Sequence, residues 1–171
     1  SAGGATSPVS LPAEVGITNV EIGDVDANGI PDILVASSID GAILYFEATG
    51  SREFAPAVQV ASITDPGGLL LADLDGDARL DIAATSLEDN VVTIFDGNGA
   101  GGFSAMASVT TGSTPLSLAA GDADTDGDVD LVVVSADNDE VFYLRGPGFS
   151  TAVSIDSSSG SQDIGLFSLD G

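Results

Sequence analysis

LAAGDADTDGDVDLVVV, residues 118–134, joins a run of alternating aspartates to a run of apolar residues. Two related stretches precede it, DVDANGIPDI at residues 24–33 and DLDGDARLDI at residues 73–82. Their first aspartates, Asp24, Asp73 and Asp122, follow one another at a constant spacing of 49 residues. In each stretch, oxygen-bearing side chains occupy positions one, three, five and nine. The chain is therefore an internal repeat whose most regular part is an acidic loop.

Such a loop is typical of a site for a hard divalent cation, because alternate residues of a curled loop can point to one centre. Calcium takes six to eight oxygens at about 2.3–2.6 Å and tolerates irregular geometry, so the pattern predicts three Ca²⁺ sites, one per loop. The backbone carbonyl at position seven adds a ligand whatever its side chain, and water completes the sphere. The predicted ligands are Asp24, Asp26, Asn28, Ile30 and Asp32; Asp73, Asp75, Asp77, Arg79 and Asp81; and Asp122, Asp124, Asp126, Asp128 and Asp130.

Position six is where the loop is expected to turn sharply with a positive φ angle. Glycine adopts such angles without steric cost, and Gly29 and Gly127 stand there in the first and third loops. The second loop has Ala78 instead, at a cost of about 1 kcal/mol if it must be left-handed. We therefore expect the second site to be slightly distorted or to rely on Gly76.

The EF-hand, which also begins with alternating aspartates, is excluded. It requires a bidentate glutamate at position twelve and a helix on each side. Position twelve is here Val35, Ala84 or Val133, each within a short apolar run typical of a buried strand. The nine-residue repeat of calcium-binding β-helices is excluded as well, because the period is far longer.

Each repeat reads as four short strands, because a helical period is absent and glycine and proline separate short apolar segments. The predicted strands are residues 18–23, 33–37, 42–46 and 57–61; 68–72, 82–86, 90–95 and 106–110; and 116–121, 131–135, 140–144 and 152–155. Four strands in a period of about 40 to 50 residues are typical of β-propeller blades. We predict an all-β chain of four-stranded antiparallel blades, with about three complete blades and a partial blade at each end.

The predicted domain organisation is a flexible segment, residues 1–7, followed by one repeat domain, residues 8–171. The repeats span about residues 8–56, 57–105 and 106–150, with a partial copy over 151–171. Residues 9–11 resemble a lone outer strand, and residues 164–171 resemble the start of a fourth loop. We therefore expect the chain to be part of a longer protein.

Composition narrows the class of function. The formal charge is −24, with three arginines and no lysine, histidine or cysteine. Nucleic acid is a poor partner for so anionic a surface. No apolar run is long enough to insert in a membrane. The usual catalytic bases and nucleophiles are missing and the carboxylates are assigned to metal, so we predict that the chain is not an enzyme. Calcium loops that bind weakly serve mainly outside cells, which favours an extracellular or cell-surface location.

The sequence from residue 118 to residue 134, with its counterparts, resembles the FG-GAP/VCBS repeat of integrin α-subunit propellers and of secreted bacterial proteins. Phe-Gly and Gly-Ala-Pro elements survive only in fragments such as Phe54-Ala55-Pro56, which is closer to the bacterial branch. The resemblance implies a propeller with the ligands given above. It also implies a calcium-binding module with structural, adhesion or assembly roles, whose partner is another protein or further copies of itself.

Two alternatives stay open from the residues. One is a carbohydrate-binding lectin, or the scaffold of a calcium-dependent polysaccharide-degrading enzyme, for which strand aromatics would supply a stacking platform. Those aromatics are Tyr45, Phe46, Phe95, Phe142 and Tyr143, which we expect instead to pack between blades. The other concerns the metal: we expect calcium to be a structural staple rather than the signal of a sensor.

Overall fold

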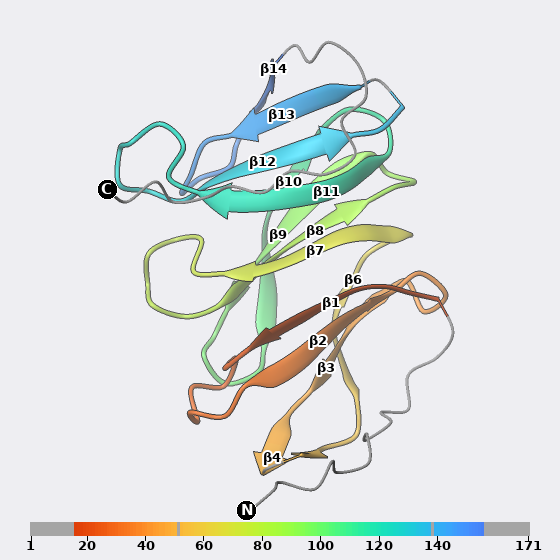
Figure 1. The fold of residues 1–171 in the computed structure, drawn as a ribbon, viewed down its shortest axis with the longest axis vertical. Coiled ribbons are helices and arrows are strands. Elements are labelled where there is room, and N and C mark those ends of the chain that lie inside the picture. Colours follow the sequence, from red (N-terminus) through yellow and green to blue (C-terminus); the bar gives the residue numbers. More distant parts are fainter. Residues whose placement is uncertain (1–15, 51, 138, 156–171) are drawn as a thin grey trace, which may run out of the picture.

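The computed structural model describes residues 16–50, 52–137 and 139–155. The predictions for residues 1–7, 9–11 and 164–171 lie outside these ranges. The described chain forms three four-stranded antiparallel sheets, stacked along the long axis of the molecule (Figure 1). A two-stranded sheet is inserted in the first repeat.

Each four-stranded sheet is a meander whose strands pair in chain order. The first sheet contains β1 (Ile17–Gly23), β2 (Asp32–Ser37), β3 (Ala42–Phe46) and β6 (Val58–Ser62). The second contains β7 (Pro66–Ala72), β8 (Asp81–Ser86), β9 (Val91–Gly97) and β10 (Phe103–Thr110). The third contains β11 (Pro115–Gly121), β12 (Asp130–Ser135), β13 (Glu140–Leu144) and β14 (Ala152–Ile155). The inserted pair is β4 (Ala48–Gly50) and β5 (Glu53–Phe54).

The predicted all-β class is confirmed, and the described residues include no helix. Every predicted strand is present, with ends that differ by a few residues. The second strand of each sheet begins one residue earlier than predicted, at the position-nine aspartate of the loop. The small sheet of β4 and β5 was not predicted, because its segments are too short to show an alternating pattern. The described part of the chain contains no helix long and apolar enough to span a bilayer.

The sheets pack face to face through two hydrophobic layers. Leu34 and Ile43 of the first sheet pack against Ile82 of the second, and all three are fully buried. On the other face of the second sheet, Ile94 packs in a cluster with Val133 of the third. The middle strands are therefore apolar on both faces, which is why their sequences read as short continuous apolar runs.

First strands of neighbouring sheets run close together, since β7 contacts both β1 and β11. Gly68 of β7 permits this approach, because a Cβ atom there would lie 3.0 Å from the Leu116 carbonyl oxygen and 2.5 Å from Leu118 Cδ2. The outer strands β6 and β10 touch only at a few residues. Each sheet is thus wedged more tightly at its first strand than at its last.

The 49-residue repeat extends to the backbone conformation. Left-handed φ angles recur at four equivalent positions in each repeat, which is more than a recurring ligand loop would produce. These positions are 16, 65 and 114; 27, 76 and 125; 29, 78 and 127; and 41, 90 and 139. The structural unit is therefore the whole four-stranded sheet with its turns.

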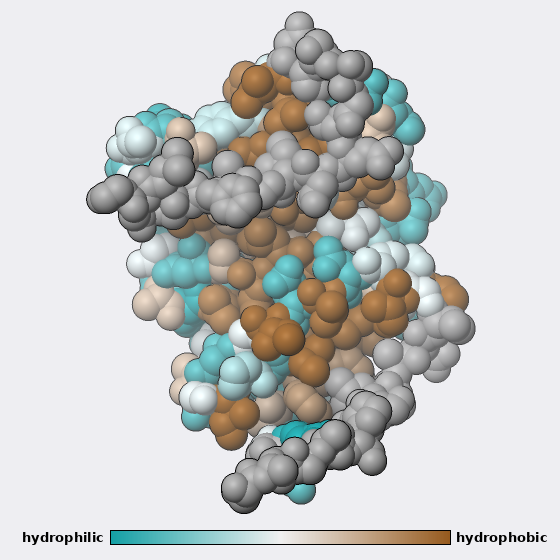
Figure 2. Space-filling view, viewed as in Figure 1, coloured by the Kyte–Doolittle hydropathy of each residue, from teal (hydrophilic) through white to brown (hydrophobic). Residues whose placement is uncertain are grey.

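The outward face of the first sheet is apolar and partly exposed. Val20 and Ile22 of β1 are 54% and 69% exposed, and their pairing places them beside Val35 and Ile33 of β2. Hydrophobic surface is visible across the middle of the molecule in Figure 2. This sheet therefore presents a face of the same kind as those that pack between the sheets.

Candidate cation-binding loops

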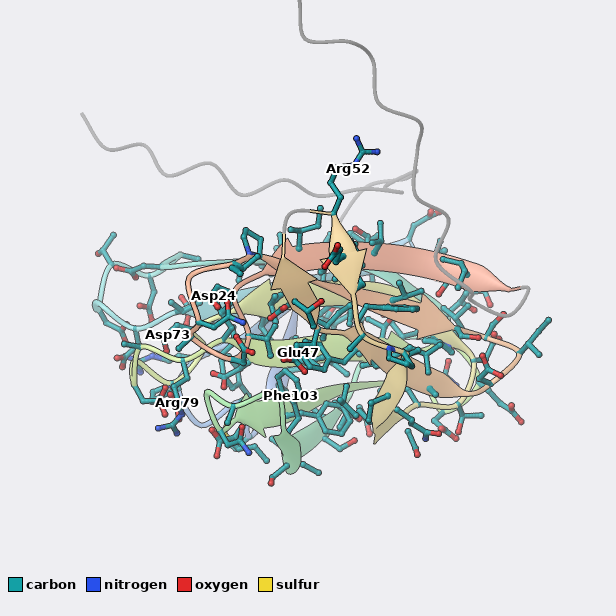
Figure 3. The ribbon with its side chains drawn as sticks, turned by 90° about the horizontal axis from the view of Figure 1, so that it is seen from below. Asp24, Glu47, Arg52, Asp73, Arg79 and Phe103 are labelled. Carbon is teal, nitrogen blue, oxygen red and sulfur yellow. The ribbon has the colours of Figure 1, made fainter. Side chains whose placement is uncertain are left out.

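The three acidic loops lie at corresponding places in the three sheets. Loop 1 (residues 24–32), loop 2 (73–81) and loop 3 (122–130) each connect the first strand of a sheet to the second. They project from the same edge of the stack, on the left in Figure 1. Figure 3 shows Asp24, Asp73 and Arg79 together on that side of the molecule, and Arg52 projecting away from the sheets.

The same hydrogen bonds shape all three loops. At position one, the Asp24 carboxylate accepts the N–H groups of Asn28 and Gly29 at 3.0 and 2.9 Å. Asp122 likewise accepts the N–H groups of Asp126 and Gly127, both at 3.1 Å. The side chains at positions three and five each accept an N–H two residues ahead, at 2.7–3.2 Å. Aspartate and asparagine are thus required for the turns of the loop as well as for any ligand role.

Positions four and six are left-handed in every loop. Loop 2 combines Gly76 (φ 82°) with Ala78 (φ 67°), whereas loop 1 combines Ala27 (φ 57°) with Gly29 (φ 85°). In loop 3 the pair is Thr125 and Gly127. Of the two expectations for loop 2, the structure fits reliance on Gly76, which is left-handed; Ala78 also adopts the left-handed angle, and the hydrogen bonds are retained. Each loop has one glycine for two left-handed positions.

The position-nine aspartates are buried junctions. Asp32, Asp81 and Asp130 are at most 1% exposed. Their Oδ2 atoms accept the N–H of position two in the same loop at 2.8–3.0 Å. Their Oδ1 atoms accept the N–H of a residue at the end of the third strand or two positions after it, again at 2.8–3.0 Å. Through these hydrogen bonds, each carboxylate joins the start of its loop to the end of the third strand of its sheet.

The donors to Oδ1 are Ala48 and Gly146, two positions after the third strand, and Gly97, the last residue of the third strand. A Cβ atom on Gly97 would lie 2.0 Å from the Leu80 carbonyl oxygen, and one on Gly146 would lie 1.9 Å from that of Val129. A side chain at either glycine would therefore clash with the loop backbone, whereas Ala48 makes the same hydrogen bond in the first sheet.

The donor set fits calcium. In each loop one carboxylate oxygen from each of positions one, three and nine lies within 4.8 Å of the other two; the sets are Asp24, Asp26 and Asp32; Asp73, Asp75 and Asp81; and Asp122, Asp124 and Asp130. Oxygens bound to one Ca²⁺ lie at most about 4.6–5.2 Å apart, twice the Ca–O distance. These residues would hold the ion, and the ion would supply positive charge that draws the two ends of the loop together.

Position five behaves differently where it is an aspartate. Asp126 belongs to no three-carboxylate set, and Asp77 lies outside the set of Asp73, Asp75 and Asp81 but forms a second set with Asp75 and Asp96. The Arg79 Nη2 contacts Asp77 Oδ2, and the Arg145 Nη2 contacts Asp126 Oδ2. The Arg145 Nε also lies 3.0 Å from Oδ2 of both Asp124 and Asp126. Ligation through position five and through the position-seven carbonyls of Ile30, Arg79 and Asp128 stays a prediction.

The electrostatic environment differs among the loops. The N–H of Asp128 and the Arg145 guanidinium hold the pKa of Asp126 below its usual range. Burial raises the pKa of Asp81, although the N–H groups of Gly97 and Leu74 partly oppose this shift. Loop 2 thus contains a buried carboxylate that resists ionisation.

A tyrosine accompanies the buried aspartate in two loops. The Tyr45 hydroxyl donates to Asp32 Oδ2 at 3.1 Å, and burial together with this bond raises the pKa of Tyr45. Tyr143 is its counterpart in the third sheet; its hydroxyl is buried without a hydrogen bond of good geometry, yet burial and the nearby carboxylates of Asp130 and Asp124 raise its pKa. Ile94 occupies this place in the second sheet.

Sequence reasoning missed these supporting residues. Arg145, Tyr45 and Gly97 lie 13 to 19 residues from their aspartate partners, outside the acidic motif. A signal was available, because Gly97 and Gly146 recur at the 49-residue offset. The burial of Asp32 and its counterparts was also missed, since all aspartates of the motif look alike in the sequence.

Successive four-stranded antiparallel sheets, each with an acidic loop after its first strand, define an all-β repeat protein with candidate cation sites. The family model described as FG-GAP-like repeat matches the chain twice, at residues 24–84 and 73–133. The two matches together span residues 24–133, more than half of the 171 residues. The chain belongs to the FG-GAP-like repeat family. A comparison with curated proteins gives no match.

Proposed function

We propose that the chain is a calcium-stabilised β-propeller segment that serves a structural, adhesion or assembly role outside cells through protein–protein contacts. The observation that carries this proposal is the threefold recurrence of one loop, with three carboxylate oxygens within 4.8 Å, on one edge of the stacked sheets. A single acidic cluster is common on protein surfaces, whereas three loops with matching hydrogen bonds indicate that each loop binds the same kind of ligand.

The propeller arrangement is supported by the wedge shape of the sheets and by the exposed apolar face of β1. Propeller blades pack face to face and converge at their first strands. Val20 and Ile22 would be covered by a further blade, in the way that the second sheet covers Leu34 of the first. That blade would come from a segment outside the residues that the structure describes, or from another copy of this chain.

Calcium would act as a staple rather than as a signal. Without cation, carboxylate oxygens within 4.8 Å of one another repel by at least about 0.9 kcal/mol per pair in water and by at least about 3.5 kcal/mol at an effective dielectric of 20. A bound ion reverses this repulsion at the base of each loop. At free calcium ten times the Kd, each site adds about 1.4 kcal/mol to the free energy of unfolding. Millimolar calcium outside cells would keep weak sites of this kind filled.

A role in binding rather than catalysis is supported by what surrounds the loops. The carboxylates are engaged in turns and junctions, and the chain has no histidine, cysteine or lysine to serve as base or nucleophile. Tyr45, Phe46 and Phe95 are buried, so they offer no stacking platform for a sugar. The carbohydrate alternative therefore receives no support from these side chains.

The test is a calcium titration of the chelator-treated protein by calorimetry, with the melting temperature measured in parallel. We expect binding at three sites and a melting temperature that rises with calcium and falls again with excess chelator. The proposal that calcium stabilises the fold would be refuted if the protein bound no calcium at millimolar concentration, or if its melting temperature did not change with calcium. Native-gel or scattering measurements with and without calcium would then show whether assembly depends on the filled loops.

A further inference from the structure

The two arginines that reach the loops follow a rule set by position five. Loops 2 and 3 have an aspartate there, and each of these aspartates is paired with an arginine. Loop 1 has the neutral Asn28, and the residues equivalent to Arg79 and Arg145 are Ile30 and Glu47. An arginine thus accompanies the position-five aspartate in both repeats that have one.

The two arginines reach position five from different places in the fold. Arg79 is position seven of loop 2 itself, and its Nε donates to the Gly97 carbonyl oxygen at 2.6 Å. Arg145 follows the third strand of the third sheet, at the place that Asp96 occupies in the second. Because the same pairing is built from two unrelated sequence positions, it is not a by-product of the repeat.

The arginine–aspartate pairs equalise the formal charge at positions one, three, five and nine of the three loops. At positions one, three, five and nine, loop 1 has three carboxylates, whereas loops 2 and 3 have four each. Over these four positions, one guanidinium beside each of loops 2 and 3 reduces the formal charge to that of loop 1, although loop 3 has a further carboxylate at position seven, Asp128. In loop 3 the paired Asp126 lies outside the carboxylate set, and in loop 2 the paired Asp77 lies outside the set of positions one, three and nine, although it forms a second set with Asp75 and Asp96.

We propose that Arg79 and Arg145 are built-in competitors of calcium: each holds the position-five aspartate in the metal-free loop and gives it up when the ion binds. This inference rests on the proposed function, because it concerns the same three sites. The guanidinium weakens calcium binding in two ways, by withholding one ligand and by placing a positive charge beside the carboxylates. In return it limits repulsion among the carboxylates while the loop is empty, so loops 2 and 3 stay folded at low calcium.

Loop 3 offers the cleaner test, because Arg145 makes its described contacts only with Asp124 and Asp126 and is exposed. Its occupancy can be followed separately with terbium, a calcium substitute whose luminescence is excited through a nearby tyrosine. The chain has two tyrosines, Tyr45 beside loop 1 and Tyr143 beside loop 3. A Tyr45→Phe background therefore leaves a terbium signal from loop 3 alone.

We expect Arg145→Gln to bind terbium at loop 3, and calcium in competition with it, about two- to fivefold more tightly than the parent, the range for loss of an exposed ion pair. The matched control is Arg52→Gln, which removes the same charge from a side chain that points away from the sheets (Figure 3). Its affinity should change by less than that of Arg145→Gln. The gain should also shrink at high salt, which screens exposed charges.

A double-mutant cycle separates competition from a general effect of charge. Asp126→Asn gives loop 3 the position-five residue of loop 1 and removes the main partner of Arg145. In that background Arg145→Gln should change the affinity by less than half as much as in the parent. Unchanged or weaker binding by Arg145→Gln, or an equal gain in the parent and in the Asp126→Asn background, would overturn the inference while leaving calcium binding intact. Failure of the parent to bind either ion would instead overturn the proposed function and this inference with it.

Discussion

Asp32→Asn is the perturbation that separates the metal-independent part of a loop from the metal-dependent part. Asp32 is fully buried, and its two oxygens accept from different donors: Oδ2 from Val25 N–H and Tyr45 hydroxyl, Oδ1 from Ala48 N–H. Asparagine has the same shape but only one acceptor oxygen. Whichever way its amide is oriented, an NH₂ group faces a backbone N–H.

The cost follows from that mismatch. A hydrogen bond to a charged group contributes about 1.5–3 kcal/mol, and a buried donor left unsatisfied costs about 1–3 kcal/mol; these figures overlap for one bond. We expect Asp32→Asn to lower the free energy of unfolding by about 2–4 kcal/mol in the presence of chelator. For a domain of this size that lowers the melting temperature by roughly 4–16 °C.

The matched control is Asp26→Asn, at position three of the same loop. Asp26 is partly exposed, and its oxygens accept only from Asn28. Its charge also repels Asp24 and Asp32, so loss of that charge compensates for the weakened turn. With chelator we expect a change within about 1 kcal/mol, and with calcium a clear loss of the metal-dependent increment. Equal melting temperatures for the two variants in chelator would refute the junction role of the buried carboxylate.

Ala78→Gly should raise the free energy of unfolding by about 0.5–1 kcal/mol, because relief of the left-handed strain exceeds the added entropy of the unfolded chain. A denaturant titration measures this change, and no gain would mean that position six is unstrained. Gly97→Ala should lower the free energy of unfolding by at least about 2 kcal/mol, since its Cβ would lie 2.0 Å from the Leu80 carbonyl oxygen. Ala48→Gly, at the equivalent position, should lower it by about 1 kcal/mol or less. Similar losses for the two variants would contradict the close approach at Gly97. In chelator, the raised pKa of Asp81 means that the native state binds more protons between the unfolded pKa near 3.9 and the folded value, so stability falls as pH rises through that window. Thermal melts from about pH 4 to about pH 7 should show this slope in the parent and a weaker one in Asp81→Asn, and parallel slopes would count against it.

The sequence predicted the strands and the loops because both are local patterns with strong physical causes. Alternating aspartates need a curled loop, and apolar runs such as that of β12 need burial on both faces. Because the repeat is 49 residues long, a strand or loop assigned in one repeat is also assigned at the equivalent positions of the other two. Sequence reasoning failed where a contact joins residues far apart in a repeat, as for Asp81 with Gly97 or Arg145 with Asp126. Such pairs carry no local spacing rule, so only the register of the sheet reveals them.

The backbone of loop 2 shows why Ala78 is tolerated at position six. A single loop suggests that glycine is required at position six, but the three loops together show two left-handed positions and one glycine shared between them. The loop tolerates one strained residue of about 1 kcal/mol because the carboxylate of position one accepts the N–H groups on that side of the turn. Strain is therefore offset within the loop by its own aspartate and does not need the ion.

Each loop is consequently held in two ways: by hydrogen bonds to its buried aspartate, and by neutralisation of its outer carboxylates. The buried position-nine carboxylate fixes the start of the loop to the end of the third strand through backbone N–H groups, and these hydrogen bonds do not require a cation. The outer carboxylates, at positions one, three and five, repel one another until a cation or an arginine neutralises them. Calcium removal should therefore loosen the outer turn before it separates the strands. A chelator should increase amide hydrogen exchange at positions four to six most in loop 1 and less in loops 2 and 3, whose position-five aspartates are paired with arginines, while β2, β8 and β12 stay protected. Simultaneous loss of protection in loops and strands would show that the ion holds the sheet itself together.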